Sequence, residues 1–364
     1  MPKNKINQIE PYISHTDKSE ISKYLKSGGW ITEHKQNKNF ENKFKKITHS
    51  KFAVTFPNGT LTLFGMLMSL NIKKGDEVIV PSYTMVATAN AVKLTGANIV
   101  FADISKESLC LCHKSLIKKI TKKTRAVIYV TLNGRSGSID KIKSICNKKK
   151  INLLEDSAHS IGSYFKKKHH GNFGIAGSFS FSMPKIITTG QGGMVVTNNF
   201  QIYKKLLKLK NFGRITDGND VYNSIGYNFK FTDIQATLGL SQLKSLTWRM
   251  KQKKKIFKYY FKFLSKNNNI KLFNFSKSET PWFVDIYVDK PKELQKFLQK
   301  KGVKTRLVYP SLDTLPIFNY KGKNKVANYY CSRGLWLPSS LNLNKSKILH
   351  ISNLINNFFE IVND

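Results

Sequence analysis

Short apolar runs alternate with longer amphipathic segments through the first two hundred residues. Seven of the runs have the length of β-strands: Phe52–Phe56, Glu77–Pro81, Asn98–Asp103, Ala126–Thr131, Asn152–Glu155, Ser178–Phe181 and Met194–Thr197. Segments of helical length, with turn residues at their ends, lie between several of them: Asn58–Leu70, Met85–Leu94 and Asp140–Lys149. This alternation predicts an α/β fold, a three-layer α/β/α structure with a mostly parallel sheet between helices. Most of the runs are continuously apolar, as is typical of strands that are buried on both faces.

The pattern becomes helical between Asp233 and Leu264, where apolar residues recur at helical spacing. A run of this length predicts one long helix or two helices joined end to end. Beyond about residue 267, a strand-like segment at Trp282–Val288, a helix at Pro291–Lys301 and a final amphipathic helix at Lys345–Ile361 indicate a smaller α+β domain. We therefore divide the chain into a large domain, residues 1–245, and a small C-terminal domain, residues 246–364.

Composition places few limits on function. The 364 residues are 40% hydrophobic and 23% charged, which is ordinary for a folded soluble protein. No apolar stretch is long enough to span a bilayer, and residues 1–20 lack the apolar segment of a signal peptide, so we expect a cytoplasmic protein. The four cysteines show no paired spacing of zinc ligands, so we expect reduced thiols and no metal site.

The net charge of +39 is the most unusual feature of the sequence. It raises the alternative of a non-enzymatic basic protein that binds nucleic acid. However, only six of the 61 basic residues are arginines, and the lysines are spread along the whole chain. Runs such as Lys251–Lys255 and Lys166–Lys168 are expected to be solvated faces. We therefore expect no nucleic-acid partner, although a positive surface would attract a substrate that carries a diphosphate.

Two segments carry polar residues at the ends of predicted strands. Gly59 and Thr60 lie between a strand and a helix, where glycine permits a tight turn and the free amides attract an anion. When this segment is considered alone, a plain turn with a helix cap is the simpler explanation. Asp156 and His159 follow an apolar strand, at the edge of the sheet where α/β folds usually place their active sites. The alternatives are a cap of the following helix for Asp156 and a helix histidine for His159.

A third segment surrounds Lys185, which stands among apolar residues in a chain whose lysines are mostly in polar surroundings. Burial lowers the pKa of a lysine, and the neutral amine is the nucleophilic form. The hydroxyl of Ser180, five residues earlier, is suited to hold a phosphate. A surface lysine remains the alternative when this segment is considered alone.

Together these segments resemble a known family over nearly the whole chain. The matching stretches are Gly28–Ile31, Phe56–Thr60, Gly75–Thr84, Ala87–Ala91, Glu155–Gly162, Phe179–Gly193, Gly226–Phe229, Tyr309–Pro310 and Leu335–Pro338. The sequence is similar to the DegT/StrS sugar aminotransferases, enzymes of fold type I that depend on pyridoxal 5′-phosphate (PLP). The resemblance therefore implies PLP as the cofactor and transfer of an amino group to a keto sugar as the reaction.

The resemblance also implies roles for individual residues. Lys185 matches the lysine that holds the cofactor covalently and moves the proton between cofactor and substrate. Asp156 matches the acid that pairs with the pyridine nitrogen, and His159 matches a position close to the 3-hydroxyl of the ring. Gly59, Thr60 and Ser180 match the cradle of the phosphate.

Further residues matter for partner and substrate. Asn228 matches an asparagine that reaches the phosphate of the neighbouring subunit, which implies a homodimer with shared active sites. Met85 stands where relatives usually carry an aromatic ring over the cofactor. Tyr309, Arg306 and Arg214 are candidate substrate contacts by location and chemistry, with a packing tyrosine or solvated arginines as the alternative. Other departures are Thr131–Gly134, Gln191 and Phe212.

The expected reaction moves an amino group from glutamate to a nucleotide-linked keto sugar, with a 4-keto-6-deoxyhexose aminated at C4 as the first choice. Pro281-Trp282-Phe283 looks like the corresponding segment of perosamine-type synthases. A 3-keto sugar or a cyclitol remains open as the acceptor. O-antigen, capsule and antibiotic pathways all fit. Sugar dehydratases of the same fold carry histidine in place of the lysine, so Lys185 argues against them.

Overall fold

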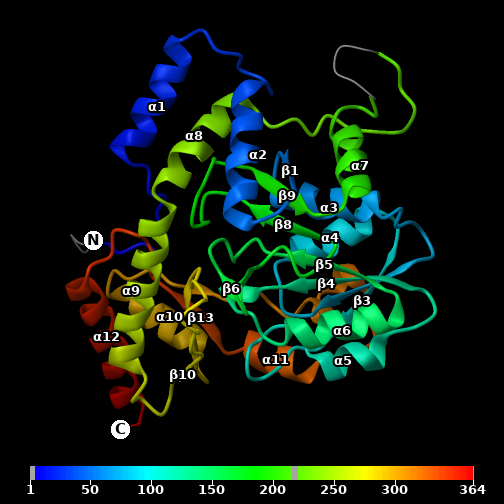
Figure 1. Ribbon diagram of the computed structural model, residues 1–364. Coiled ribbons are helices and arrows are strands. Elements are labelled where there is room, and N and C mark those ends of the chain that lie inside the picture. Colours follow the sequence, from blue (N-terminus) through cyan, green and yellow to red (C-terminus); the bar gives the residue numbers. More distant parts are fainter. Residues whose placement is uncertain (1–4, 215–219, 364) are drawn as a thin grey trace.

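The computed structural model describes residues 5–214 and 220–363 (Figure 1). A seven-stranded sheet lies at its centre, with the strand order β1-β9-β8-β5-β4-β2-β3. Its strands are β1 (Phe52–Phe56), β2 (Glu77–Pro81), β3 (Asn98–Ala102), β4 (Thr124–Val130), β5 (Asn152–Asp156), β8 (Ala176–Ser180) and β9 (Gly193–Thr197). All seven predicted strands are present, and the α/β fold class is confirmed.

The sheet is mostly parallel, as expected, with one antiparallel strand inside it. Strands β3, β2, β4, β5 and β8 run parallel, whereas β9 is antiparallel to both β8 and β1. Residues 181–192, which join β8 to β9, contain no helix. A parallel pair needs a long crossover, so a link of this kind suits antiparallel neighbours. As a result, the segment that contains Lys185 turns back at the edge of the sheet and returns beside β1.

Helices cover both faces of this sheet. One apolar cluster holds Val78 and Val80 and packs under three helices: α3 (Gly59–Ser69), α4 (Val86–Leu94) and α7 (Phe200–Lys210). The other cluster holds Ile79 and packs under four helices: α2 (Lys35–Thr48), α5 (His113–Lys119), α6 (Ile139–Lys149) and α8 (Asp233–Lys244). Successive strand residues point to opposite faces, so each continuously apolar run serves both layers.

A second, antiparallel sheet follows in the order β10-β11-β13-β12. Its strands are β10 (Lys271–Leu272), β11 (Val284–Tyr287), β12 (Arg306–Leu307) and β13 (Gly334–Leu337). Three helices pack on it at the left of Figure 1: α9 (Leu246–Leu264), α10 (Pro291–Lys300) and α12 (Lys345–Asn363). The remaining elements are α1 (His15–Lys26), α11 (Lys325–Cys331) and a hairpin of β6 (Tyr164–Phe165) and β7 (Lys168–His169).

Helices α8 and α9 meet end to end at Ser245, as the helical pattern predicted. Tyr287 and Trp336 of the second sheet, together with Phe273 directly after β10, join the core cluster of the large sheet, so the two sheets share one apolar interior. The division into residues 1–245 and 246–364 stays a prediction, and the outer limits of both ranges, residues 1 and 364, lie outside the described residues. All four cysteines are free thiols.

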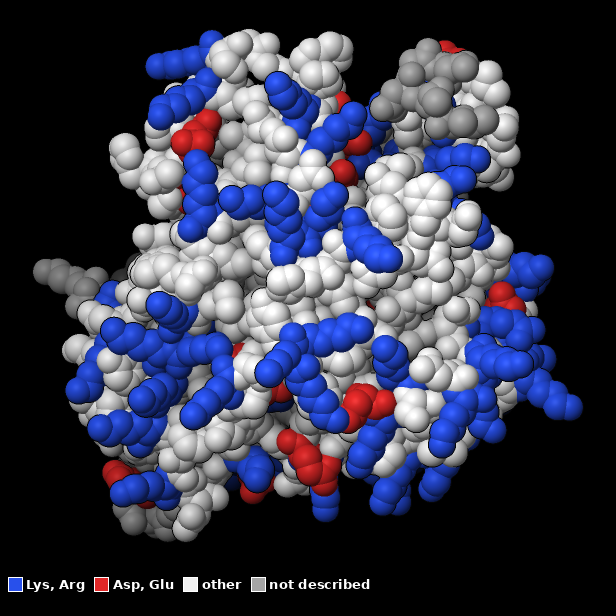
Figure 2. Space-filling model, viewed as in Figure 1, with Lys and Arg blue, Asp and Glu red and all other residues white. Residues whose placement is uncertain are grey.

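Basic side chains are spread over the whole visible face of the molecule, with few acidic side chains among them (Figure 2). One prediction about these lysines is wrong, because Lys253 in the run Lys251–Lys255 is only 3% exposed. Its amine donates to the carbonyl oxygens of Trp282 at 2.9 Å and Ser339 at 2.7 Å. Helix α9 packs on the second sheet here, and carbonyl groups next to the strands accept from this lysine. Within residues 5–214 and 220–363, no helix has the length and apolar character needed to cross a bilayer.

Candidate active site

Asp156 is the last residue of β5, and its side chain is buried at the carboxyl edge of the sheet. The hydroxyl of Thr88 in α4 donates to its Oδ2 at 2.7 Å, and the amide of Ala158 donates to its Oδ1 at 3.2 Å. Residues 157–163 form turns and no helix, so the alternative that Asp156 caps a helix is wrong. Burial raises the pKa of Asp156, while the bond from Thr88 opposes this shift. A buried carboxylate with these two donors is suited to a cationic partner.

Lys185 lies in the link between β8 and β9, near the same edge of the sheet. Its side chain is half-buried, and its amine lies over the ring of Trp282 at 4.2 Å from the ring centre. Burial lowers the pKa of Lys185 to about 7, although Asp156 attracts the charged form and works against this shift. The amine is therefore neutral in an appreciable fraction of molecules near pH 7, which is the form that attacks an aldehyde.

His159 lies in the turn after β5 and is stacked on Trp282, with ring centres 3.9 Å apart. The backbone amide of Asn133 donates to Nδ1 of His159 at 3.2 Å. Burial lowers the pKa of His159 well below its ordinary value, and the nearby Lys185 adds to this effect. The ring is therefore neutral with its proton on Nε2, so this nitrogen is a hydrogen-bond donor.

Gly59 begins α3 beside the end of β8. A Cβ atom at Gly59 would lie 2.9 Å from Cβ of Ser180, so a larger residue would close the space between the helix and the strand. Asn58 caps α3 by accepting from the amide of Leu61, and the hydroxyl of Ser180 is 3.3 Å from that of Ser182. Thr60 is half-buried in the first turn of α3. Free amides and hydroxyls at a helix N-terminus bind phosphate well.

Three further predicted residues surround this edge of the sheet. Met85 is 41% exposed at the start of α4, three residues before Thr88, and its sulfur accepts from the amide of Ala87. Tyr309 is half-buried and packs edge-on against Trp336. Burial raises the pKa of Tyr309, the Arg306 charge lowers it and the Asp156 charge raises it. Arg306 is exposed in β12, with its guanidinium 5.8 Å from the ring centre of Tyr309.

Arg214 and Asn228 belong to a different part of the chain, between α7 and α8. Arg214 forms an ion pair with Asp220 at 2.6 Å and a hydrogen bond with the hydroxyl of Tyr222 at 3.2 Å. Asn228 is exposed, and residues 220–232 run across the top of Figure 1 to the start of α8. Within this chain, then, Arg214 binds its own loop, and Asn228 presents its side chain to the outside.

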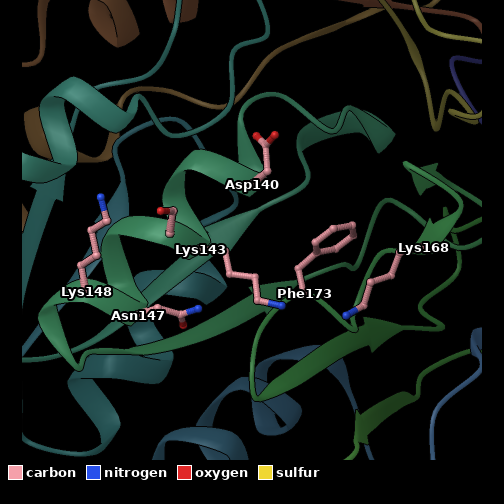
Figure 3. Close-up of a pocket in the computed structure, with 7 residues that line it drawn as sticks. Asp140, Lys143, Asn147, Lys148, Lys168 and Phe173 are labelled. Atoms are coloured by element: carbon pink, nitrogen blue, oxygen red, sulfur yellow. The ribbon is translucent and has the colours of Figure 1, made fainter.

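A hollow of about 380 Å³ lies on the surface beside α6 and is open to solvent (Figure 3). Its lining residues are Asp140, Lys143, Ser144, Asn147, Lys148, Lys168 and Phe173. None of the predicted site residues contributes to it. Its polar groups are mainly surface lysines, so the hollow differs in chemistry from the site at Asp156 and Lys185.

The groups around Asp156 and Lys185 fit PLP. The buried carboxylate matches a protonated pyridine nitrogen, the half-buried amine matches the aldehyde, and the start of α3 beside Gly59 matches the phosphate. Thr88 and Trp282 lie in segments that resemble the family, but the resemblance implies no role for either residue. Their contacts with Asp156, Lys185 and His159 join residues far apart in the sequence, and no local pattern reveals such contacts.

Comparisons with known proteins agree with this chemistry. The DegT/DnrJ/EryC1/StrS aminotransferase family model matches residues 11–356. GDP-perosamine synthase of Escherichia coli O157:H7 is 35% identical over 358 residues, covering 96% of this chain and 97% of that protein. GDP-perosamine synthase of Vibrio cholerae is 31% identical over 368 aligned residues, covering 97% and 99%. The solved structure of Helicobacter pylori PseC, an aminotransferase involved in the biosynthesis of pseudoaminic acid, has a TM-score of 0.92 at 26% identity, over 98% of this chain and 100% of that chain.

These matches confirm the predicted resemblance, the fold and the PLP cofactor. The protein is a PLP-dependent sugar aminotransferase, and nothing in the matches supports the nucleic-acid-binding alternative. Its substrates are a sugar and an amino donor. The family match spans residues 11–356, and therefore the chain belongs to the DegT/DnrJ/EryC1/StrS aminotransferase family.

Proposed function

We propose that this enzyme transfers the amino group of glutamate to C4 of a nucleotide-linked 4-keto-6-deoxyhexose. The main support is the identity of 35% and 31% with two GDP-perosamine synthases over nearly the full length of both. The names of these relatives make a GDP-linked sugar the first acceptor to test. Pathways that build O-antigen or related polysaccharides would use such a product.

Asp156 and Lys185 would carry the central chemistry. When bound, PLP supplies an aldehyde that exchanges with amines and a ring that accepts the electron pair of a broken C–H bond. Asp156 would hold the proton on the pyridine nitrogen, because a carboxylate within hydrogen-bonding distance favours the charged ring. Lys185 would remove the α-proton of the amino donor and return a proton to the sugar carbon. The pKa of Lys185, lowered by burial to about 7, suits an amine that acts as base and as acid in turn.

Other residues would hold and orient the cofactor. The amides of Gly59 and Thr60, together with the hydroxyl of Ser180, would bind the phosphate at the start of α3. The Nε2 proton of His159 would be donated to the 3-oxygen of the ring, because its Nδ1 already accepts from Asn133. Met85 would cover one face of the ring through its polarisable sulfur.

We also propose a homodimer in which Asn228 reaches the phosphate site of the neighbouring subunit. The loop that carries Asn228 exposes several apolar side chains, including Ile225 at 83%, Tyr222 at 54% and Val221 at 48%. Apolar groups in this number are typical of a surface that a protein partner covers. Tyr309 and Arg306 would contact the substrate from the same chain, and Arg214 would do so from the partner.

The test is an assay of the purified enzyme with glutamate and keto sugars linked to GDP, UDP or dTDP. We expect release of 2-oxoglutarate with the GDP-linked 4-keto-6-deoxyhexose, and a product aminated at C4 by NMR. Amination at C3, or turnover of a cyclitol alone, would refute the proposed acceptor.

Lys185→Ala should fold and retain its oligomeric state but show no turnover, because no other amine takes the proton at this position. Lys118→Ala, which removes an exposed lysine of α5, serves as the control and should be fully active. Normal turnover by Lys185→Ala would disprove the assignment of the site.

A further inference from the structure

Trp282 uses every polar atom that it has to bind three separate parts of the chain. Its indole Nε1 donates to the carbonyl of Pro184 at 2.7 Å, directly before Lys185. Its backbone amide donates to the carbonyl of Asn133 at 3.3 Å, and its own carbonyl accepts from Lys253 at 2.9 Å. Trp282 itself stands two residues before β11 of the second sheet. One residue therefore links the second sheet with the Lys185 segment, with the turn at Asn133 and with α9.

The indole ring also contacts two groups that carry the proposed chemistry. One contact is the stack with His159, with ring centres 3.9 Å apart and planes inclined by 18°. The other is the amine of Lys185, 4.2 Å from the ring centre. Phe283 lies against the indole with ring centres 3.8 Å apart, which limits its movement. The side chain is 2% exposed, so its position is determined by packing on all sides.

Helix α9 holds this arrangement with two buried basic side chains one turn apart, those of Arg249 and Lys253. Lys253 holds the carbonyls of Trp282 and Ser339 together. Arg249 donates to the carbonyl of Ile186 at 3.3 Å, directly after Lys185. The same face of α9 therefore binds the backbone beside Trp282 and the backbone beside Lys185. A movement of α9 or of the second sheet would change the relation between the two residues.

We propose that Trp282 is a positioning residue that ties the second sheet to the Lys185 segment and fixes the ring of His159. This proposal rests on the proposed function of Lys185 and His159. Trp282 takes no part in proton transfer. It acts through the segment that its Nε1 holds and through the histidine that it stacks on. Lys253, bound to the carbonyl of Trp282, supports it from α9.

Three variants separate these effects, and one control matches them. Trp282→Phe removes the hydrogen bond to Pro184 but keeps an aromatic face for His159. Trp282→Leu removes both. Lys253→Met keeps most of the buried stem and removes the two bonds to carbonyl groups. Trp248→Phe is the control, because Trp248 is also on α9, is 38% exposed and packs on Tyr12 away from the site.

The first measurement is hydrogen exchange of the cofactor-free protein, followed on peptides that cover residues 183–190. Both Trp282 variants and Lys253→Met should exchange faster there, by roughly two- to twelve-fold, the factor that corresponds to the loss of one hydrogen bond. Peptides of α7 should be unchanged in every variant, and Trp248→Phe should match the wild type throughout. Unchanged exchange of residues 183–190 in Trp282→Phe and in Lys253→Met would refute the proposal that Trp282 holds the Lys185 segment to the second sheet.

The second measurement is the pH titration of the visible absorption band of the PLP-loaded protein. Trp282→Leu should move the midpoint, because His159 is no longer held by the stack, whereas Trp282→Phe should restore the wild-type midpoint. Equal midpoints in all three proteins would overturn the role in fixing His159. If Trp282→Leu does not fold, a midpoint moved by Lys253→Met in the same assay supports the role, and an unmoved one refutes it. Failure of the proposed function would look different, since wild-type protein would then bind no PLP at Lys185 while the exchange result could still stand.

Discussion

The hydrogen bond from the hydroxyl of Thr88 is expected to stabilise the charged carboxylate of Asp156, and its removal tests this directly. Thr88 is fully buried in α4, and its hydroxyl donates to Oδ2 of Asp156 at 2.7 Å. Thr88→Val replaces the hydroxyl by a methyl group of similar size, so the packing is nearly preserved while the hydrogen bonds to Asp156 and to the hydroxyl of Thr84 are lost. The carboxylate is then left with the amide of Ala158 as a donor.

The size of the effect follows from the charge of the acceptor. A hydrogen bond to a charged group contributes about 1.5–3 kcal/mol, whereas one between neutral groups contributes about 0.5–1.5 kcal/mol. Burial raises the pKa of Asp156, so the folded chain keeps this proton to a higher pH than the unfolded chain does. Stability associated with this group is therefore lost as the pH rises above the unfolded pKa of about 3.9. The bond from Thr88 lowers the pKa of Asp156, so Thr88→Val should raise this pKa further above its unfolded value. The variant should therefore lose more stability than the wild type over the same pH range.

The assay is urea unfolding of the cofactor-free protein at pH 8 and at pH 4. At pH 8 we expect Thr88→Val to lower the free energy of unfolding by about 1.5–3 kcal/mol, and at pH 4 by about 0.5–1.5 kcal/mol. Thr48→Val is the control, because the buried hydroxyl of Thr48 donates to the neutral carbonyl of Phe44. The free energy of unfolding lost in Thr48→Val should be the same at both pH values. An equal loss for Thr88→Val at pH 8 and pH 4 would show that Asp156 is not the charged acceptor that we describe.

Three further changes test other parts of the site. Asp156→Asn should lower the pH midpoint at which an amine reagent labels Lys185 in the cofactor-free protein, because Asp156 opposes the effect of burial on the lysine pKa. Peptide mass spectrometry measures the labelling, and a midpoint that stays or rises would contradict this expectation. Met85→Tyr should tighten PLP binding about two- to twelve-fold in equilibrium dialysis, as expected for an added aromatic stack, and an unchanged affinity would place Met85 away from the ring. Arg135→Met breaks the buried ion pair between Arg135 and Asp285, in which the nearest nitrogen and oxygen are 2.6 Å apart. Urea unfolding should show a free energy of unfolding lower by about 3–5 kcal/mol, and a loss below about 1 kcal/mol would contradict this expectation.

The large sheet was predictable because its strands carry a strong local signal. Each is a continuous apolar run, and a strand that is buried on both faces needs such a run. The second sheet was harder, since β10 and β12 contain two residues each and owe their pairing to distant strands. Helix α2 was not predicted from the sequence. Phe40 and Phe44 are its only fully buried apolar residues among many lysines, so the apolar pattern is weak. Such a helix forms mainly through tertiary packing.

The residues of the site also differ in how far the local sequence predicts them. Asp156 and Lys185 stand at strand ends and in a distinctive motif, so the sequence could point to them, although their roles remain predictions. Thr88 is 68 residues from Asp156, and Trp282 is 98 residues from Pro184. Nothing in the neighbouring sequence of either residue reveals these pairings. The burial of Lys253 was missed for a related reason, since its acceptors are carbonyl groups of the backbone and leave no trace in residue types.

The lysine-rich surface in Figure 2 affects how cofactor content should be measured. All but six of the 61 basic residues are lysines, and the aldehyde of PLP combines reversibly with any neutral amine that it meets. In excess reagent, the yellow colour of a preparation would therefore report scattered adducts as well as filled sites. Stoichiometry is better determined after gel filtration and reduction, as the fraction of the Lys185 peptide that carries the added mass.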